Sequence, residues 1–143
     1  MSIVNYLGCD FILPLSDDDC TDEILIGSNF SEVQDRENVR KHFSTKYKYV
    51  YEIYTNEFVG IWINDYYKSE YPKSNKEGQQ NFKALCDLLD NHLSEGNHCQ
   101  LYTCWVGDEL DERKVEFDQT ITLNNYDIDD IELYEKTLLV IKK

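Results

Sequence analysis

Apolar runs and sharp alternation of apolar with polar positions dominate the chain and predict strands. Ile3–Leu15 is apolar and β-prone, and Glu23–Gly27 is short and aliphatic. Tyr47–Thr55 alternates with a period of two, and Phe58–Asn64 follows it after a short polar turn, which predicts a β-hairpin. Further strands are predicted in the C-terminal part, at Cys99–Val106, Lys114–Leu123 and Leu133–Ile141.

Helical periodicity occurs in two places. Ser31–Phe43 predicts a short helix in which acids precede bases, as the helix dipole favours. Asn75–Glu95 predicts a long helix followed by Gly96, a residue favoured just beyond a helix C-terminus. The apolar residues that recur at helical spacing in the long helix are Phe82, Leu85, Cys86, Leu89 and Leu93. Asp65–Asn75 is polar, rich in tyrosine and contains Pro72, so it predicts a loop.

The order of these elements predicts the fold class. Hairpin-length links between neighbouring strands favour antiparallel pairing. We therefore expect an α+β fold with a mostly antiparallel sheet of about six to seven strands, one long helix and one short helix. A length of 143 residues without an interdomain linker predicts a single domain over residues 1–143.

The acidity of the chain predicts the type of partner that it binds. The chain has 28 Asp and Glu against 14 Lys and Arg, a formal net charge of -14. Residues 1–35 contain no Lys or Arg, and residues 105–143 are also strongly acidic, whereas residues 36–83 contain more bases than acids. A field of this sign attracts basic proteins and repels nucleic acid and anionic membranes. We expect a basic protein partner and neither direct nucleic acid binding nor membrane binding.

Motifs for catalysis or cofactor binding are absent from the sequence. It contains neither a phosphate-binding glycine loop nor a Gly-x-Ser-x-Gly nucleophile motif. Cys99 and Cys104 lie an odd number of positions apart in a predicted strand, so their side chains should fall on opposite faces rather than share a metal ion. We expect no cofactor and no metal. The N-terminus has no signal-peptide pattern, which predicts a cytoplasmic protein with reduced cysteines.

Candidate partner-binding residues come from acidic clusters and from the predicted tyrosine-rich loop. Clustered carboxylates can pair with a basic partner, although such clusters are more often solvated turns that keep the protein soluble. Exposed tyrosines bury area and keep a hydroxyl for hydrogen bonding, although they can also fold back over the sheet. We expect Trp62 and Trp105 in the core. The candidate binding residues are Asp17, Asp18, Asp19, Tyr66, Tyr67, Asp108, Glu109, Asp111 and Glu112.

Three C-terminal segments resemble a known class of protein. They are QLYTCWVGDE at residues 100–109, ITL at 121–123 and DIELYEKTLLVI at 130–141. Their pattern resembles small bacterial immunity proteins, which protect a cell from its own secreted polymorphic toxins. The resemblance extends over residues 97–143, with a further match at Cys9–Pro14. It implies an acidic, single-domain, cytosolic protein that plugs a toxin active site. No functional residue transfers by motif, because the shared pattern falls on core positions.

The acidity and the resemblance lead to one expectation and two alternatives. We expect an immunity protein, not an enzyme, that binds and occludes a basic toxin, such as a nuclease. The first alternative is a DNA-mimicking acidic regulator or inhibitor of a nucleic-acid-binding protein. The second is a small hydrolase that uses clustered carboxylates, which would require a pocket containing a titratable pair.

Overall fold

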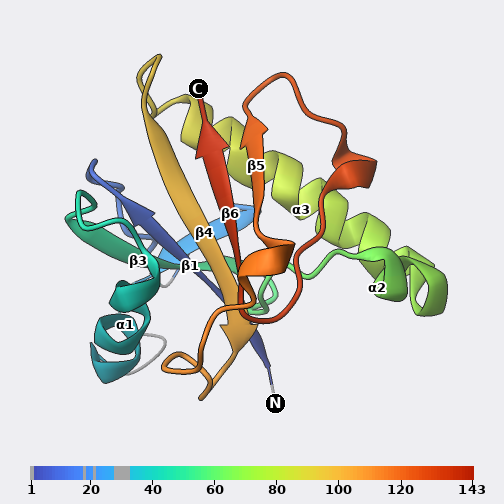
Figure 1. The fold of residues 1–143 in the computed structure, drawn as a ribbon. Helices are drawn as coiled ribbons and strands as arrows, with labels where there is room; N and C mark the ends of the chain where they lie inside the picture. Colours follow the sequence, from blue (N-terminus) through green and yellow to red (C-terminus); the bar gives the residue numbers. More distant parts are fainter. Residues whose placement is uncertain (1, 18, 21, 28–32) are drawn as a thin grey trace.

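A six-stranded sheet with the order β2-β3-β1-β4-β6-β5 forms the centre of the protein (Figure 1). The computed structural model describes residues 2–17, 19–20, 22–27 and 33–143. The strands are β1 (Ile3–Cys9), β2 (Ile24–Gly27), β3 (Tyr49–Thr55), β4 (His98–Trp105), β5 (Gln119–Thr122) and β6 (Thr137–Lys142). The helices are α1 (Val33–Val39), α2 (Asp65–Glu70) and α3 (Pro72–Asp90), with short 3-10 turns at Arg40–His42, Val115–Phe117 and Ile128–Asp130.

All neighbouring strands pair antiparallel except β5 and β6, which run parallel. The predicted α+β class with a mostly antiparallel sheet is therefore confirmed. β1 lies at the centre, where Leu7 is opposite both Tyr51 of β3 and Leu101 of β4. No helix among the described residues combines the length and the apolar character needed to cross a membrane.

The larger core lies between the sheet and α3, which runs along one face (Figure 1). The apolar spacing that predicts this helix is confirmed: Phe82, Leu85 and Leu89 are fully buried against the sheet. Leu93 is buried just beyond the end of the helix. Burial of one such side chain stabilises the fold by roughly 1.5–3 kcal/mol.

The opposite face carries a smaller core, which α1 and the turn after it cover. The ring of Phe43 lies directly on Gly8, where a Cβ atom would come within 2.7 Å of the ring. This face also buries charge, since Glu52 of β3 is fully buried and pairs with Arg36 of α1 at 3.5 Å. Cys104 lies on this face and Cys99 on the α3 face, as their odd spacing predicts.

The predicted first strand is too long. β1 ends at Cys9 rather than at Leu15, because its pairing with β3 and β4 ends at Cys9 and Gly8. The chain beyond it is held by other bonds, such as the donation from the Leu13 N–H to the Tyr51 hydroxyl at 3.0 Å. Apolar character continues past the strand because Leu13 enters the core without a strand partner.

The predicted strand Phe58–Asn64 is wrong, and so is the hairpin. Both sides of β3 are already occupied by β1 and β2, so no edge is open to a hairpin partner. The segment is buried at Ile61 and Ile63, which explains the alternation. The buried side chain of Asn5 takes the place of a strand, because it accepts from the Ile61 N–H at 2.5 Å and donates to the Ile61 carbonyl at 3.2 Å.

The predicted loop at Asp65–Asn75 is also wrong, because it forms α2 and the first turn of α3. Asn64 caps α2 by accepting from the Tyr67 N–H at 2.8 Å. Pro72 starts α3 at a position where a helix tolerates proline because no N–H is needed. The two helices are separated by Tyr71 alone, so the tyrosines lie on short helical turns instead of a flexible loop.

Other boundaries differ in detail. β5 covers only Gln119–Thr122 of the predicted strand 114–123, because residues 115–117 form a 3-10 turn. α1 and the 3-10 turn after it account for the described part of the predicted helix Ser31–Phe43, whose first two residues lie outside the described residues.

Candidate functional site

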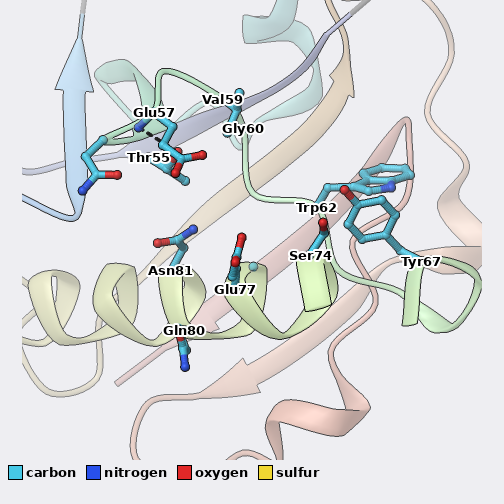
Figure 2. A pocket seen from close by; sticks show the side chains of 12 residues that line it. Thr55, Glu57, Val59, Gly60, Trp62, Tyr67, Ser74, Glu77, Gln80 and Asn81 are labelled. Carbon is cyan, nitrogen blue, oxygen red and sulfur yellow. Dashed lines mark hydrogen bonds between the residues drawn. The ribbon is translucent and has the colours of Figure 1, made fainter. Parts of the chain in front are cut away.

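A polar hollow of about 270 Å³ opens between α3, α2 and the turn that follows β3. We call it the acidic cleft. Figure 2 shows that Glu57 from the turn and Glu77 from α3 point into the same space, with Trp62 and Tyr67 at one end. Asn81 also points into it, whereas Gln80 points away. The remaining lining residues are Thr55, Asn56, Val59, Gly60, Ser74 and Gly78.

Two glycines bring the walls of the cleft together. A Cβ atom on Gly60 would lie 2.6 Å from the Ile3 carbonyl oxygen, and one on Gly78 would lie 2.7 Å from a methyl group of Ile63. Both positions therefore require glycine for close approach of backbone segments. The turn itself is fixed by bonds from the Phe58 N–H to the Thr55 carbonyl and from the Thr55 N–H to the Val59 carbonyl, at 2.9 and 2.8 Å.

The two acids of the cleft form no ion pair within the described part of the chain. Neither Glu57 nor Glu77 forms an ion pair with any residue that the structure describes, and none of the lining residues is a Lys or an Arg. Both glutamates are exposed. Two carboxylates that share a hollow repel each other mildly and attract a cation. The charge of the lining residues thus favours a cation over an anion in the cleft.

An apolar hollow of about 400 Å³, which we call the aromatic groove, lies beside the acidic cleft. Trp62 lines both hollows and separates them. Its ring centroid lies 5.9 Å from that of Trp105 and 6.3 Å from that of Tyr134. Phe117 completes the wall at 6.1 Å from Tyr134 and is 49% exposed. Asn64, Tyr66, Lys114 and Glu135 also line the groove.

The segment between β4 and β5 forms one wall of the groove. Its backbone is tied to the turn before β6, because the Lys114 N–H donates to the Lys136 carbonyl at 2.7 Å. Lys136 itself adopts a left-handed conformation with φ 62° and donates its N–H to the Thr103 carbonyl at 2.7 Å. The ion pair of Lys114 with Glu135 at 3.2 Å closes the rim.

The predicted binding tyrosines lie at these hollows. Tyr67 lines the acidic cleft and Tyr66 lines the aromatic groove, both from α2. Tyr66 is 63% exposed, so its ring does not fold back over the sheet. The rings of Tyr67 and Tyr71 lie 5.3 Å apart and support each other.

The predicted acidic cluster at residues 108–112 has a different environment. Glu109 is 1% exposed, and its carboxylate accepts from the Tyr6 hydroxyl at 3.1 Å and the Gly107 N–H at 2.9 Å. Burial raises the pKa of Glu109. Its carbonyl oxygen is 2.8 Å from Nε2 of the buried His42, which stacks on Tyr102. Glu109 is therefore bonded within the fold and is almost completely shielded from solvent.

Basic residues lie near Asp111 and Glu112 in the rest of that cluster. Asp111 pairs with Lys136 at 3.1 Å, and Lys41 donates to the carbonyl of Leu110. Glu112 is exposed and lines a shallow hollow together with Lys41 and Arg113. Asp108 is half-buried, with its N–H bonded to the Trp105 carbonyl at 3.0 Å. Of the four candidate acids in this cluster, Asp111 alone forms an ion pair with a described residue, while Glu109 is buried and Glu112 is exposed.

The N-terminal acidic cluster is set apart from both hollows. Asp17 and Asp19 are exposed and line neither hollow, and Asp18 lies outside the described residues. The Asp17 carbonyl accepts from the Cys20 N–H at 3.1 Å in the segment between β1 and β2.

Asp65 and Glu132 form a close carboxylate pair outside both hollows. The Asp65 N–H donates to Glu132 Oε2 at 3.0 Å, and burial together with the Asp65 carboxylate raises the pKa of Glu132. Neither residue lines the cleft or the groove. Among the residues described, no three His, Cys, Asp or Glu side chains come together as metal ligands.

Sequence reasoning missed the groove because it assigned both tryptophans to the core. Trp62 and Trp105 are half-buried, and each shows part of its ring to the groove. A signal for the cleft was present in α3, where Ser74, Glu77 and Asn81 recur at helical spacing on one polar stripe. No family model matches the chain, and no curated protein or solved structure matches it.

Proposed function

We propose that this protein is a binding protein, not an enzyme, that neutralises a basic protein toxin by occluding its active site. The observation that carries the proposal is the junction of the acidic cleft and the aromatic groove at Trp62, in a chain of net charge -14. Tight interfaces combine aromatic anchors in a pocket with complementary charge around them. Both parts occur here side by side.

Each hollow has a role in this proposal. The groove takes an apolar anchor of the toxin between Tyr66, Trp105 and Phe117, and that contact governs the dissociation rate. The cleft and the overall negative field attract basic residues around the toxin's active site, which raises the association rate. The resemblance of the C-terminal segments to immunity proteins of polymorphic toxin systems supports the same role.

The test is capture followed by neutralisation. Tagged protein is used to capture partners from the lysate and the secretome of the encoding organism, at low and at high salt, and the partners are identified by mass spectrometry. We expect one basic toxin domain that stays bound at high salt and whose toxicity is lost when this protein is co-expressed. Tyr66→Ala combined with Phe117→Ala should release it.

Two results would contradict the proposal. A mixed set of DNA-binding proteins that wash off at high salt would favour a DNA mimic. A captured toxin that remains active in the presence of excess protein would exclude occlusion of its active site.

A further inference from the structure

We infer that the acidic cleft is a receptor for the guanidinium group of one arginine side chain of the partner. This inference deepens the proposed function, because it names the chemical group that the partner inserts. It is carried by the convergence of Glu57, Glu77, Trp62 and Tyr67 on one hollow of about 270 Å³ (Figure 2).

The walls of the cleft match the three properties of a guanidinium. Its positive charge meets the carboxylates of Glu57 and Glu77, which come from opposite walls. Its flat faces stack on aromatic rings, and Trp62 and Tyr67 stand at one end. Its five N–H donors need several acceptors, and the side-chain oxygens of Asn56, Ser74 and Asn81 are available around the carboxylates.

The electrostatics of the surroundings favour a cation from outside the chain. The bases nearest in sequence to Glu77 are Lys73 and Lys76 on α3, and neither lines the cleft. Lys68 of α2 lies 3.9 Å from Asp129 and is thus directed to another acid. No ion pair with a described residue therefore competes with a ligand for the cleft carboxylates, in contrast to the ion-paired acids elsewhere in the structure.

Arginine fits better than lysine for geometric reasons. A lysine ammonium is a compact point charge with three donors, whereas the planar guanidinium can bond two carboxylates in its plane while its face contacts a ring. The aromatic rings stand at one end of the cleft and the carboxylates along its sides, so the hollow offers a planar cation both kinds of partner.

The inference is tested without the toxin, by NMR titration of the ¹⁵N-labelled protein with N-acetyl-arginine amide. We expect saturable shifts of the Gly60 and Gly78 amides and of the Trp62 indole N–H, with a Kd on the order of a few millimolar. N-acetyl-citrulline amide has nearly the same shape without the charge and should bind at least about tenfold more weakly. N-acetyl-lysine amide should fall between the two.

Matched variants locate the binding. Glu57→Gln with Glu77→Gln should weaken binding of the arginine probe about tenfold or more. Glu95→Gln with Asp87→Asn removes the same charge at exposed positions outside the cleft and should leave the Kd within about twofold. Spectra that superimpose away from the cleft establish that both variants are folded.

The inference is overturned if the citrulline probe binds as well as the arginine probe, or if the cleft variant keeps the wild-type Kd. Its failure is separable from that of the proposed function. A captured toxin that is released by Tyr66→Ala with Phe117→Ala but retained by the cleft variant contradicts the arginine site alone. Binding of the arginine probe without any captured toxin would support the site and contradict the proposed function.

Discussion

The segment at residues 106–112 and the acidic cleft both carry carboxylates, but these carboxylates differ in their contacts within the chain. In the segment, Glu109 is bonded internally to Tyr6 and Asp111 pairs with Lys136. In the cleft, Glu57 and Glu77 have no base among the residues described. The cleft acids even come from residues 36–83, the stretch that contains more bases than acids. The neighbours of a carboxylate in space, rather than acid density along the chain, decide whether it can bind.

The largest expected effect is on partner binding when both cleft charges are reversed. Glu57→Lys with Glu77→Lys should weaken the toxin complex by about 4 kcal/mol, on the order of 1000-fold, because two charge contacts become repulsive. Isothermal titration calorimetry measures the loss. Glu95→Lys with Asp87→Lys is the control with the same change in net charge at exposed positions outside the cleft. Equal loss in both variants would mean that the general field acts and not the cleft.

For Glu109 we expect a loss of stability rather than a loss of toxin binding. Glu109→Ala should lower the free energy of unfolding by about 2 kcal/mol, because the Tyr6 hydroxyl and the Gly107 N–H lose their buried acceptor. Urea unfolding measures this, with Glu112→Ala expected to change it by less than about 0.5 kcal/mol. Unchanged stability together with weaker toxin binding would assign Glu109 to the interface and contradict the contrast between this segment and the cleft.

Tyr66 separates binding from folding in the groove. Tyr66→Ala should weaken toxin binding by about 1.5 kcal/mol, roughly tenfold, because an aromatic anchor is lost. Its unfolding free energy should change little, since the ring is 63% exposed. Calorimetry and urea unfolding of the same sample measure both quantities. A loss of stability as large as the loss of binding would contradict a role as an anchor.

The smallest effect concerns the Asp65–Glu132 pair, where two acids face each other. Because the pKa of Glu132 is raised in the folded state, its contribution to stability is complete below about pH 4.5 and is lost as pH rises through the raised pKa. Glu132→Gln should therefore stabilise the protein at pH 7 by less than about 1 kcal/mol and give no gain at pH 4. Urea unfolding at both pH values measures this. An equal gain at both would show that charge repulsion is not the cause.

The fold class was predictable because buried faces of helices and strands give apolar residues a regular spacing in the sequence. The apolar spacing of α3 and the alternation of β3 report which face meets the core. Alternation does not report whether an extended segment joins the sheet, which is why residues 58–64 were misassigned. Their partner is the single side chain of Asn5, far away in the chain, and no local pattern encodes that pairing.

The site was predictable only in part, because local patterns do not report which distant segments come together. Tyr66 and Tyr67 stood out because they had no place in a predicted core, and both line the hollows. Trp62 and Trp105 did not stand out, because hydrophobicity alone places them inside. The shape of the segment that covers them, fixed by bonds between Lys114, Lys136 and Thr103, decides how much of each ring stays open.

The distribution of the cysteines has a practical consequence. Cys9, Cys86 and Cys99 lie in the α3 face and Cys104 in the α1 face. Burial raises the pKa of Cys9 to about 12 and that of Cys86 to about 11, and it also raises the pKa of Cys99 and Cys104. Since the thiolate is the reactive form, these thiols react with alkylating reagents only when their layer opens. The alkylation rates of individual cysteines, measured by mass spectrometry of peptides, would therefore report separately how often each half of the core opens.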